Sequence, residues 1–555
     1  MNRPAGRTSR PADLIVHNAH VHTVDDARPR AEAVAVRAGR IAWIGDGDDW
    51  RELAGPDTDL VDARGRLVLP GFVDSHNHVR LGSDADCVQL AGAATLAEIG
   101  ARIAERLRTH PEADWIEGEA FDYSAIPGGR MPTAADLDPF TGGRPAFVLS
   151  YDVHTAWLNT AALHRLGITR DTTELPYGTV RKDPATGEPT GFLTDFAVKG
   201  LSRAGHRALR AAGVPWAAPD RQYGRLLSSL DMAARYGITT VVEPQNSLDD
   251  LALFERAMAE GRLRSRLVAA LFHPRGTTAA ELAEFAEVSR RYTSDRLRVG
   301  PLKLYIDDVV EPHTAALLEP YAGHHSHRGE TFYPPEEFAE VLAGLDAAGF
   351  QAFVHATGDR GIRTVLDAVE HARRVNGPRD ARHQVVHVEC LDPADVSRFA
   401  ELGVVACMQP RHCSPDIAGP GRDWAEAVGE QRWTKAWPMR SLHRAGATLA
   451  LSSDWNVAEM DPLIGLYTAV TRRGLGGGDP WMPQETLDLA TAVRGYTLGS
   501  AYANFLDDEL GSLTPGKLAD LVLLSDDLFD REPKAILDAR VELSVVGGEI
   551  VHRAG

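Results

Sequence analysis

The chain of 555 residues is longer than one ordinary domain, and its content of 44% hydrophobic and 25% charged residues is that of a soluble globular protein. A formal net charge of −19 argues against nucleic acid as a partner, because a phosphate backbone is bound by a basic surface. We recognise no secretory signal in residues 1–13 and no apolar run long enough to span a bilayer, so we expect no membrane association.

The cysteines indicate the redox environment. There are four of them, they form no CxxC pair, and they are too sparse for a disulfide framework in a chain of this size: Cys87, Cys390, Cys407 and Cys413. We therefore expect a reducing, cytoplasmic location.

Both ends of the chain contain a strand, glycine turn, strand pattern. Residues 34–44 and 543–551 predict β-hairpins, and residues 14–24 and 519–524 predict further strands. We expect residues 1–69 and 500–555 to form one composite β-sandwich domain. Two unrelated edge hairpins are the alternative.

Between the termini, strand-like apolar runs alternate with helical patterns such as 279–292 and 335–348. Eight such strands are expected: 71–75, 239–243, 266–272, 297–305, 350–355, 384–388, 404–408 and 448–452. Eight strand–helix repeats predict an α/β fold of the (β/α)8 TIM barrel type over residues 70–84 and 231–499. Residues 85–230 interrupt the repeat after strand one and predict an inserted α/β subdomain, with helices at 96–109 and 155–166.

The first predicted barrel strand ends in His76-Asn77-His78. Alternate residues of an extended chain point to the same side, so His76 and His78 can offer two nitrogens to one metal ion. Neutral imidazole is the commonest protein ligand for zinc and similar ions. Two polar histidines in a loop are the alternative.

Further polar residues follow the later strands, at the barrel end where functional residues gather. His355, His387 and Asp454 lie in or just after strands five, six and eight, and Lys303 lies within strand four between apolar neighbours. Burying an ammonium group is costly unless it is paired or loses its charge. Carbamylation would convert Lys303 into a carboxylate that bridges two cations. A lysine that reaches the barrel mouth or pairs with Asp307 is the alternative.

Several longer motifs resemble the amidohydrolase superfamily, and within it the group called amidohydrolase family 3, which includes formamide-deformylating enzymes. The resemblance covers nearly the whole chain and is carried by residues 70–78, 152–159, 187–191, 302–305, 355–360, 453–455 and 511–521. It implies a barrel with a composite sandwich and one or two divalent metal ions, expected to be zinc. The implied ligands are His76 and His78 for the first ion, His355 and His387 for the second, carboxylated Lys303 between them, and Asp454 on the first ion.

The implied function is that of a hydrolase acting on carbon–nitrogen bonds other than peptide bonds. A zinc-like ion lowers the pKa of its bound water to roughly 7 and polarises a carbonyl, and Asp454 would act as the general acid and base. The substrate would be a small molecule, with an N-substituted formamide or a related N-acyl compound as one type. Cyclic amides, lactones or esters, and a non-catalytic binding protein on the same scaffold, are alternatives.

Substrate contacts are predicted from position alone. His154 and Trp157 lie in the insertion, and Arg411 and His412 follow strand seven, where Arg411 could grip a carboxylate or carbonyl oxygen. For each of them, a packing or surface contact is the alternative. Asp359 either orients a ligand imidazole or begins a helix.

The sequence departs from the group's usual pattern at Thr357, at residues 308–312 and at residues 386–389, which lie near the expected site and leave the substrate open. Four tryptophans near the later strand ends suggest walls for a bulky substrate, with core packing as the alternative: Trp433, Trp437, Trp455 and Trp481. A homodimer is a further possibility.

Overall fold

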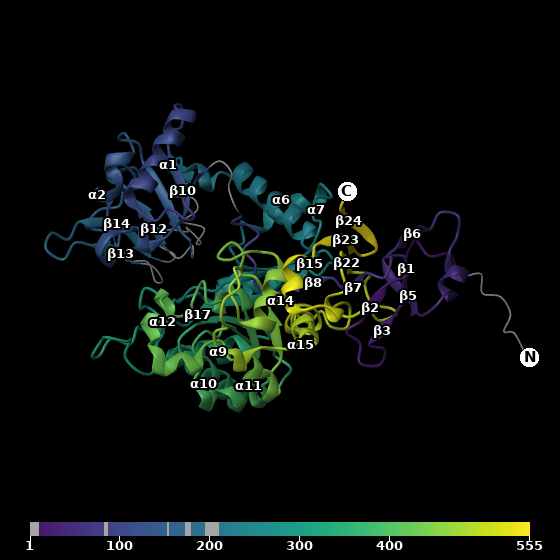
Figure 1. The fold of residues 1–555 in the computed structure, drawn as a ribbon. Coiled ribbons are helices and arrows are strands. Elements are labelled where there is room, and N and C mark those ends of the chain that lie inside the picture. Colours follow the sequence, from purple (N-terminus) through teal and green to yellow (C-terminus); the bar gives the residue numbers. More distant parts are fainter. Residues whose placement is uncertain (1–9, 83–86, 152–154, 173–178, 195–209) are drawn as a thin grey trace, which may run out of the picture.

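A computed structural model of the chain describes residues 10–82, 87–151, 155–172, 179–194 and 210–555. Within these residues the strands form four sheets: one barrel sheet, two sheets that pack together at the termini, and one sheet in the insertion. Figure 1 shows the inserted domain (blue) and the terminal sheets (purple and yellow) as separate bodies beside the barrel.

The barrel sheet contains eight parallel strands in the order β21-β20-β19-β18-β17-β16-β15-β8. All eight predicted strands are confirmed, with ends that shift by a few residues: β8 (Phe72–Asp74), β15 (Ile238–Asn246), β16 (Arg266–Phe272), β17 (Leu297–Tyr305), β18 (Ala352–Ala356), β19 (Gln384–His387), β20 (Val405–Met408) and β21 (Leu449–Leu451). The edge strands β8 and β21 meet just beyond their ends, where Asp454 N donates to His76 O at 2.8 Å. The barrel is therefore nearly closed.

Helices follow the barrel strands and bury their apolar faces against them. They include the two barrel helices that the sequence predicted, α8 and α9. The helices are α6 (Pro219–Arg235), α7 (Leu251–Ala259), α8 (Ala279–Arg291), α9 (Pro335–Ala347), α10 (Asp359–Asn376), α11 (Val396–Leu402), α12 (Asp423–Val428), α13 (Met439–Arg444), α14 (Pro462–Thr471) and α15 (Leu489–Arg494). Because the strand-to-helix turns all open at one end, the barrel gathers the side chains at its carboxyl strand ends into one region.

The chain termini form a composite β-sandwich, as predicted. One sheet has the order β5-β4-β1-β6 and the other β24-β23-β22-β7-β2-β3, so strands from both ends of the chain share the second sheet. The strands of the whole sandwich are β1 (Leu14–His17), β2 (His20–His22), β3 (Arg30–Ala31), β4 (Ala33–Arg37), β5 (Arg40–Gly45), β6 (Asp59–Asp62), β7 (Leu67–Pro70), β22 (Leu521–Leu524), β23 (Val541–Val546) and β24 (Glu549–Arg553). Apolar residues of both sheets, among them Val34 and Val545, form one core. The alternative of unrelated hairpins is wrong.

The insertion is an α/β domain whose sheet has the order β13-β14-β12-β11-β10-β9. Its elements are β9 (Val88–Gln89), α1 (Leu96–Thr109), β10 (Ile116–Phe121), α2 (Ala134–Leu137), β11 (Ala146–Ser150), β12 (Thr155–Leu158), α3 (Thr160–Arg165), β13 (Val180–Lys182) and β14 (Pro189–Thr194). The helix expected over 155–166 is wrong in its first half. Thr155–Leu158 instead pairs with both β11 and β14, and Asn159 caps the shorter helix α3 through a bond from Ala162 N.

The boundary expected at residue 500 lies inside a barrel element. Helix α16 (Ser500–Ala503) packs under the barrel, where Ser500 Oγ donates to Leu451 O at 3.1 Å. Among the described residues, no helix has both the length and the apolar character needed to cross a membrane.

Candidate metal centre

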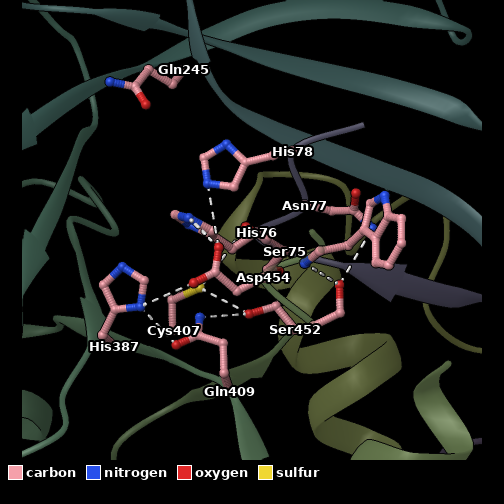
Figure 2. A network of polar contacts seen from close by, with 12 residues as sticks. Ser75, His76, Asn77, His78, Gln245, His387, Cys407, Gln409, Ser452 and Asp454 are labelled. Carbon is pink, nitrogen blue, oxygen red and sulfur yellow. Dashed lines mark hydrogen bonds and ion pairs between the residues drawn. The ribbon is translucent and has the colours of Figure 1, made fainter. Parts of the chain in front are cut away.

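His76 and His78 converge on Asp454 at the carboxyl ends of β8 and β21 (Figure 2). The Nε2 atoms of both histidines lie 3.3 Å from Asp454 Oδ1. All three side chains are buried, and one ligand atom from each lies within 4.8 Å of the others. The predicted dyad thus forms a compact cluster of two imidazoles and a carboxylate.

Asp74, the last residue of β8, holds the two sides of this cluster together. Its carboxylate accepts hydrogen bonds from Asn77 Nδ2 at 2.8 Å and from Ser453 N at 3.0 Å, and also from the Ser453 hydroxyl. It therefore fixes the segments that carry His76 and Asp454. Sequence reasoning missed Asp74, although its place two residues before the dyad is a usable signal.

The pairing of the barrel strands brings the next candidate ligands close to the cluster of His76, His78 and Asp454. Tyr305 pairs with His355, and Ala356 pairs with His387, so β18 and β19 deliver His355 and His387 at similar heights, whereas Lys303 of β17 pairs with Phe353, two residues earlier. The His387 ring centroid lies 4.5 Å from that of His355 and 5.1 Å from that of His76. His387 Nδ1 lies 3.7 Å from Asp454 Oδ2.

Gln409 fixes the orientation of His387. Its Oε1 lies 2.9 Å from His387 Nδ1, while its amide nitrogen donates to Ser452 Oγ at 2.9 Å (Figure 2). Because the amide nitrogen is already directed at Ser452, the His387 Nδ1–H donates to Gln409, which leaves Nε2 as the atom with a lone pair.

Lys303 is fully buried beneath the imidazoles, so the alternative that it reaches the barrel mouth is wrong. Its Nζ lies 4.8 Å from the ring centroid of Tyr305 and 5.0 Å from that of Phe353. Burial, followed by the positive charge of Lys303, lowers the pKa of His76 well below its usual range. The lysine therefore lies within electrostatic reach of the dyad.

The protonation states at the centre suit metal binding. Burial favours a protonated Asp454, but the imidazoles of His76, His78 and His387 hold its pKa well below the usual range. Burial lowers the pKa of His387 to about 3. An ionised carboxylate and neutral imidazoles are the forms that coordinate divalent ions.

The backbone at two of these residues is held in an uncommon conformation. His387 has φ of 79° and Asp454 has φ of 57°, in the left-handed region that side chains with a Cβ rarely adopt. Such positions persist where the surrounding structure over-determines them, and they gather at functional sites.

Two buried glutamates lie beside the centre: sequence reasoning missed Glu243, and it placed Glu389 near the site without giving it a role. Glu243 of β15 lies 3.9 Å from His78 Nδ1 and accepts a hydrogen bond from Arg80 N at 2.9 Å. Glu389 forms a second group with His387 and His412, in which one ligand atom of each lies within 4.8 Å of the others. Only the fold brings Glu243 to the site, whereas the two-residue spacing between His387 and Glu389 is a signal in the sequence.

The donor set fits a divalent metal ion. Imidazole nitrogens and a carboxylate converge in a buried site, and the Nδ1 atom of His76 and the Oδ1 atom of Asp454 have no hydrogen-bond partner among the described residues. Three protein ligands with an open side are the usual arrangement of a catalytic zinc site.

The predicted substrate contacts have mixed outcomes. His154 lies outside the described residues. Trp157 is fully buried in the core of the insertion, where its Nε1 donates to Thr133 O at 2.7 Å, so it does not line the site. His412 lines the cavity above the centre, with Nε2 3.9 Å from Asp454 Oδ2. Arg411 also lines that cavity, but its guanidinium is engaged by two carboxylates.

Asp359 does not contact a ligand imidazole in the described structure. As the first residue of α10 it accepts a hydrogen bond from Leu318 N at 2.7 Å and pairs with Lys435 at 2.8 Å. Of the four tryptophans, Trp437 and Trp455 line the cavity, whereas Trp481 packs against Trp437.

A cavity of about 750 Å³, which we call the mouth cavity, opens above the centre. His355, His387 and Asp454 form its floor, and Asp122 and Tyr151 of the insertion form part of its wall. Its volume suits a small molecule, and Asp454 connects it to the cluster with His76 and His78.

A nearly closed parallel barrel with this cluster at its carboxyl strand ends is the fold of a metal-dependent hydrolase. A family model described as "Amidohydrolase family" matches residues 59–552, and the chain belongs to that family. The family assignment made from the motifs is confirmed.

Individual relatives span nearly the whole chain. The sequence is 30% identical over 547 residues to N-substituted formamide deformylase of Arthrobacter pascens, covering 97% of each chain. It is 30% identical over 554 residues to Protein LONG AFTER FAR-RED 3 of Arabidopsis thaliana, covering 98% of this chain and 92% of that protein. The fold resembles an uncharacterized metal-dependent hydrolase from Pyrococcus horikoshii OT3 with a TM-score of 0.72 and 21% identity, covering 97% of this chain and 100% of that one.

Proposed function

We propose that the protein is a metal-dependent hydrolase that cleaves the carbon–nitrogen bond of a small-molecule amide, with N-substituted formamides as the leading substrate type. The observation that carries this proposal is the convergence of His76, His78 and Asp454 beneath a cavity of small-molecule size, in a chain of the amidohydrolase family. The similarity to a formamide deformylase supports the substrate type.

The proposed ligands are those that the resemblance implied. His76, His78 and Asp454 would hold one ion, and His355 and His387 a second, with Lys303 between them. An ammonium group beside a divalent ion is repelled, so carboxylation of Lys303 would remove a conflict as well as supply a ligand. Zinc suits imidazole and carboxylate ligands of this kind.

A bound ion would lower the pKa of a water molecule and polarise the substrate carbonyl. The protein's own groups supply the proton transfer. Asp454, ionised and in contact with both histidines of the dyad, would accept a proton during attack and return it to the leaving nitrogen. Gln409 would keep His387 in one tautomer throughout.

Metal-replete protein should be assayed against N-substituted formamides, N-acyl amines, cyclic amides and lactones, with release of amine or acid as the readout. We expect turnover of the linear amides, formamides foremost. Turnover confined to lactones would contradict the proposed bond, and turnover confined to cyclic amides would contradict the proposed linear substrate type. Full activity after metal removal would contradict the proposed centre.

Asp454→Asn should lower kcat by roughly 10²–10⁴-fold, because the amide cannot exchange a proton as the carboxylate does. The variant should keep its metal, which metal analysis would check. Glu287→Gln, on the exposed outer face of α8, is the matched control. If Asp454→Asn had the same kcat as the control, the proposed role of Asp454 in proton transfer would be contradicted.

A further inference from the structure

A second group of metal-ligating side chains lies on the cavity side of the centre, and we call it the outer triad. It consists of His387, Glu389 and His412, which are all buried. One ligand atom from each lies within 4.8 Å of the other two, and all three residues line the mouth cavity. The outer triad therefore offers two imidazoles and a carboxylate, the same donor types as the cluster at the ends of β8 and β21.

His412 contributes a nitrogen that no group in the described part of the chain occupies. The residue is 9% exposed, and its Nε2 atom is buried without a hydrogen-bond partner among the described residues. Asp454 Oδ2 lies 3.9 Å from this nitrogen, which is too far for a hydrogen bond. Buried polar atoms in native proteins are nearly always paired, so the His412 nitrogen calls for a bound partner.

Glu389 offers a carboxylate oxygen to the same position. Its Oε2 accepts a hydrogen bond from Trp424 Nε1 at 3.0 Å, whereas its Oε1 accepts none from the described residues. In the described part of the chain, no lysine or arginine comes within ion-pair distance of this carboxylate. Trp424 therefore holds the group in place and leaves one oxygen for a metal ion.

His387 can serve one ion at a time. Its Nδ1 donates to Gln409 Oε1, so Nε2 is its single coordinating nitrogen (Figure 2). An inner ion between His355 and Lys303 needs carboxylation of this buried lysine, because an ammonium group repels a divalent ion. The outer triad contains no lysine, so metal binding there does not depend on that modification.

We propose that His387, Glu389 and His412 form a metal position of their own, which binds a divalent transition-metal ion, zinc foremost, while Lys303 is uncarboxylated. Two imidazoles and a carboxylate with an open side are typical ligands of zinc. Bonds of about 2.0–2.2 Å would draw the three ligand atoms roughly 1 Å closer together, and the adjoining cavity leaves room for that movement. The inference rests on the metal centre of the proposed function and adds a position that the sequence motifs did not imply.

Lys303→Met isolates the outer position, because methionine fills most of the buried space of the lysine and cannot be carboxylated. Anomalous diffraction at the zinc edge, from crystals of this variant grown with excess zinc, locates the ions. We expect a peak about 2.0–2.2 Å from His387, Glu389 and His412, in addition to the peak at His76.

The other outcomes separate this inference from the proposed function. A peak at the first cluster alone, or a second peak beside His355 instead of Glu389, would overturn the outer position and leave the first ion standing. If neither place shows a peak, the proposed centre fails and the outer position fails with it. Should Lys303→Met prove unfolded by circular dichroism, crystals of the wild type grown in bicarbonate-free buffer take its place, with the same outcomes.

Zinc calorimetry tests the Glu389 ligand in solution. The Lys303→Met protein should bind two zinc ions. Adding Glu389→Gln should weaken the second ion by about 100-fold or more, a larger loss than the roughly 10–100-fold expected for a group that only orients a ligand. Glu485→Gln, at an equally buried glutamate outside the cavity lining, is the matched control. A second zinc ion bound as tightly in the Glu389→Gln protein as in the control would contradict the inference.

Two histidine variants in the same Lys303→Met background separate the outer from the inner position. His412→Gln should lose the second ion, whereas His355→Gln should keep it. Loss of the second ion from His355→Gln but not from His412→Gln would place that ion at the inner position and overturn the inference. This pair decides the question by itself if Glu389→Gln does not fold.

Discussion

Asp74 carries much of the organisation of the centre although it is not a proposed ligand. Its carboxylate receives hydrogen bonds from the segment that carries the dyad and from the segment that carries Asp454. Burial raises its pKa to about 6, because removal from water disfavours the ionised carboxylate. Groups that orient metal ligands in this way commonly tune affinity as strongly as the ligands themselves.

Asp74→Asn should weaken metal binding by roughly 10–100-fold, because an amide group turns a donor toward Ser453 N–H where an acceptor is needed. Competition with a chelator on purified protein measures the affinity. Asp62→Asn, at an exposed strand end, serves as the control. An Asp74→Asn protein that loses thermal stability but binds metal as tightly as the control would show that Asp74 is only structural.

The predicted ligands could be recognised from the sequence because each one lies in or just after a hydrophobic strand. His76, His355 and Asp454 are polar residues at the ends of apolar runs, and a barrel brings such ends together. Glu243 could not be recognised in this way, since its nearness to His78 depends on strand register, whereas Glu389 follows His387 by two residues and could have been noticed from that spacing. Arg411 was predicted to meet substrate because the sequence does not show that Asp416 and Glu459 engage its guanidinium.

At the scale of elements, strand and helix periodicity predicted every barrel strand and helix α1 of the insertion, but failed at residues 155–158. Residues 155–166 contain several helix-forming alanines and leucines, yet the first four residues pair with strands on both sides. Sheet pairing overrode local preference there, as is usual for a short central strand. The same segment places Trp157 in a core and not at the substrate.

Asp461 caps α14, the helix that follows barrel strand β21, by accepting a hydrogen bond from Leu463 N at 2.9 Å. Burial raises its pKa from 3.8 to about 6. The folded state thus holds the proton more tightly than the unfolded chain. The stabilisation is fully present below about pH 4 and is lost as pH rises through about 6.

Asp461→Asn should therefore stabilise the protein at pH 8 and change little at pH 4, because asparagine keeps the cap without the buried charge. The gain should be roughly 1–3 kcal/mol, since two pKa units correspond to about 2.7 kcal/mol and the favourable helix dipole offsets part of the cost. Thermal unfolding at the two pH values measures it. A variant that is less stable than wild type at pH 8 would show that the charge is favourable there.

At the scale of the whole molecule, the sandwich is tied to the underside of the barrel by a buried ion pair. Arg266 of β16 donates from Nε and Nη2 to Asp520 at 2.7 and 2.9 Å, and both side chains are buried. Because β7 runs directly into β8 and so into the dyad, the sandwich also fixes where the first metal ligands begin. Figure 1 shows β7 beside the C-terminal strand β22, so strands from both ends of the chain lie next to each other where the chain enters β8.

Asp520→Ala should cost about 3–5 kcal/mol of stability, because it leaves the Arg266 charge buried without its partner. Glu287→Ala, which breaks the exposed pair with Arg290, should cost no more than about 1 kcal/mol. Urea unfolding followed by circular dichroism compares the two proteins. Similar midpoints for both variants would contradict the structural role of the buried pair.

The central claim is that the cluster at the barrel mouth is a metal centre, and anomalous X-ray diffraction from crystals of the zinc-replete protein tests it most directly. We predict an anomalous peak about 2.0–2.2 Å from a nitrogen of His76, a nitrogen of His78 and an oxygen of Asp454. A second peak beside His387 would accompany a carboxylated Lys303. A zinc-replete crystal with no peak among these residues would contradict the account.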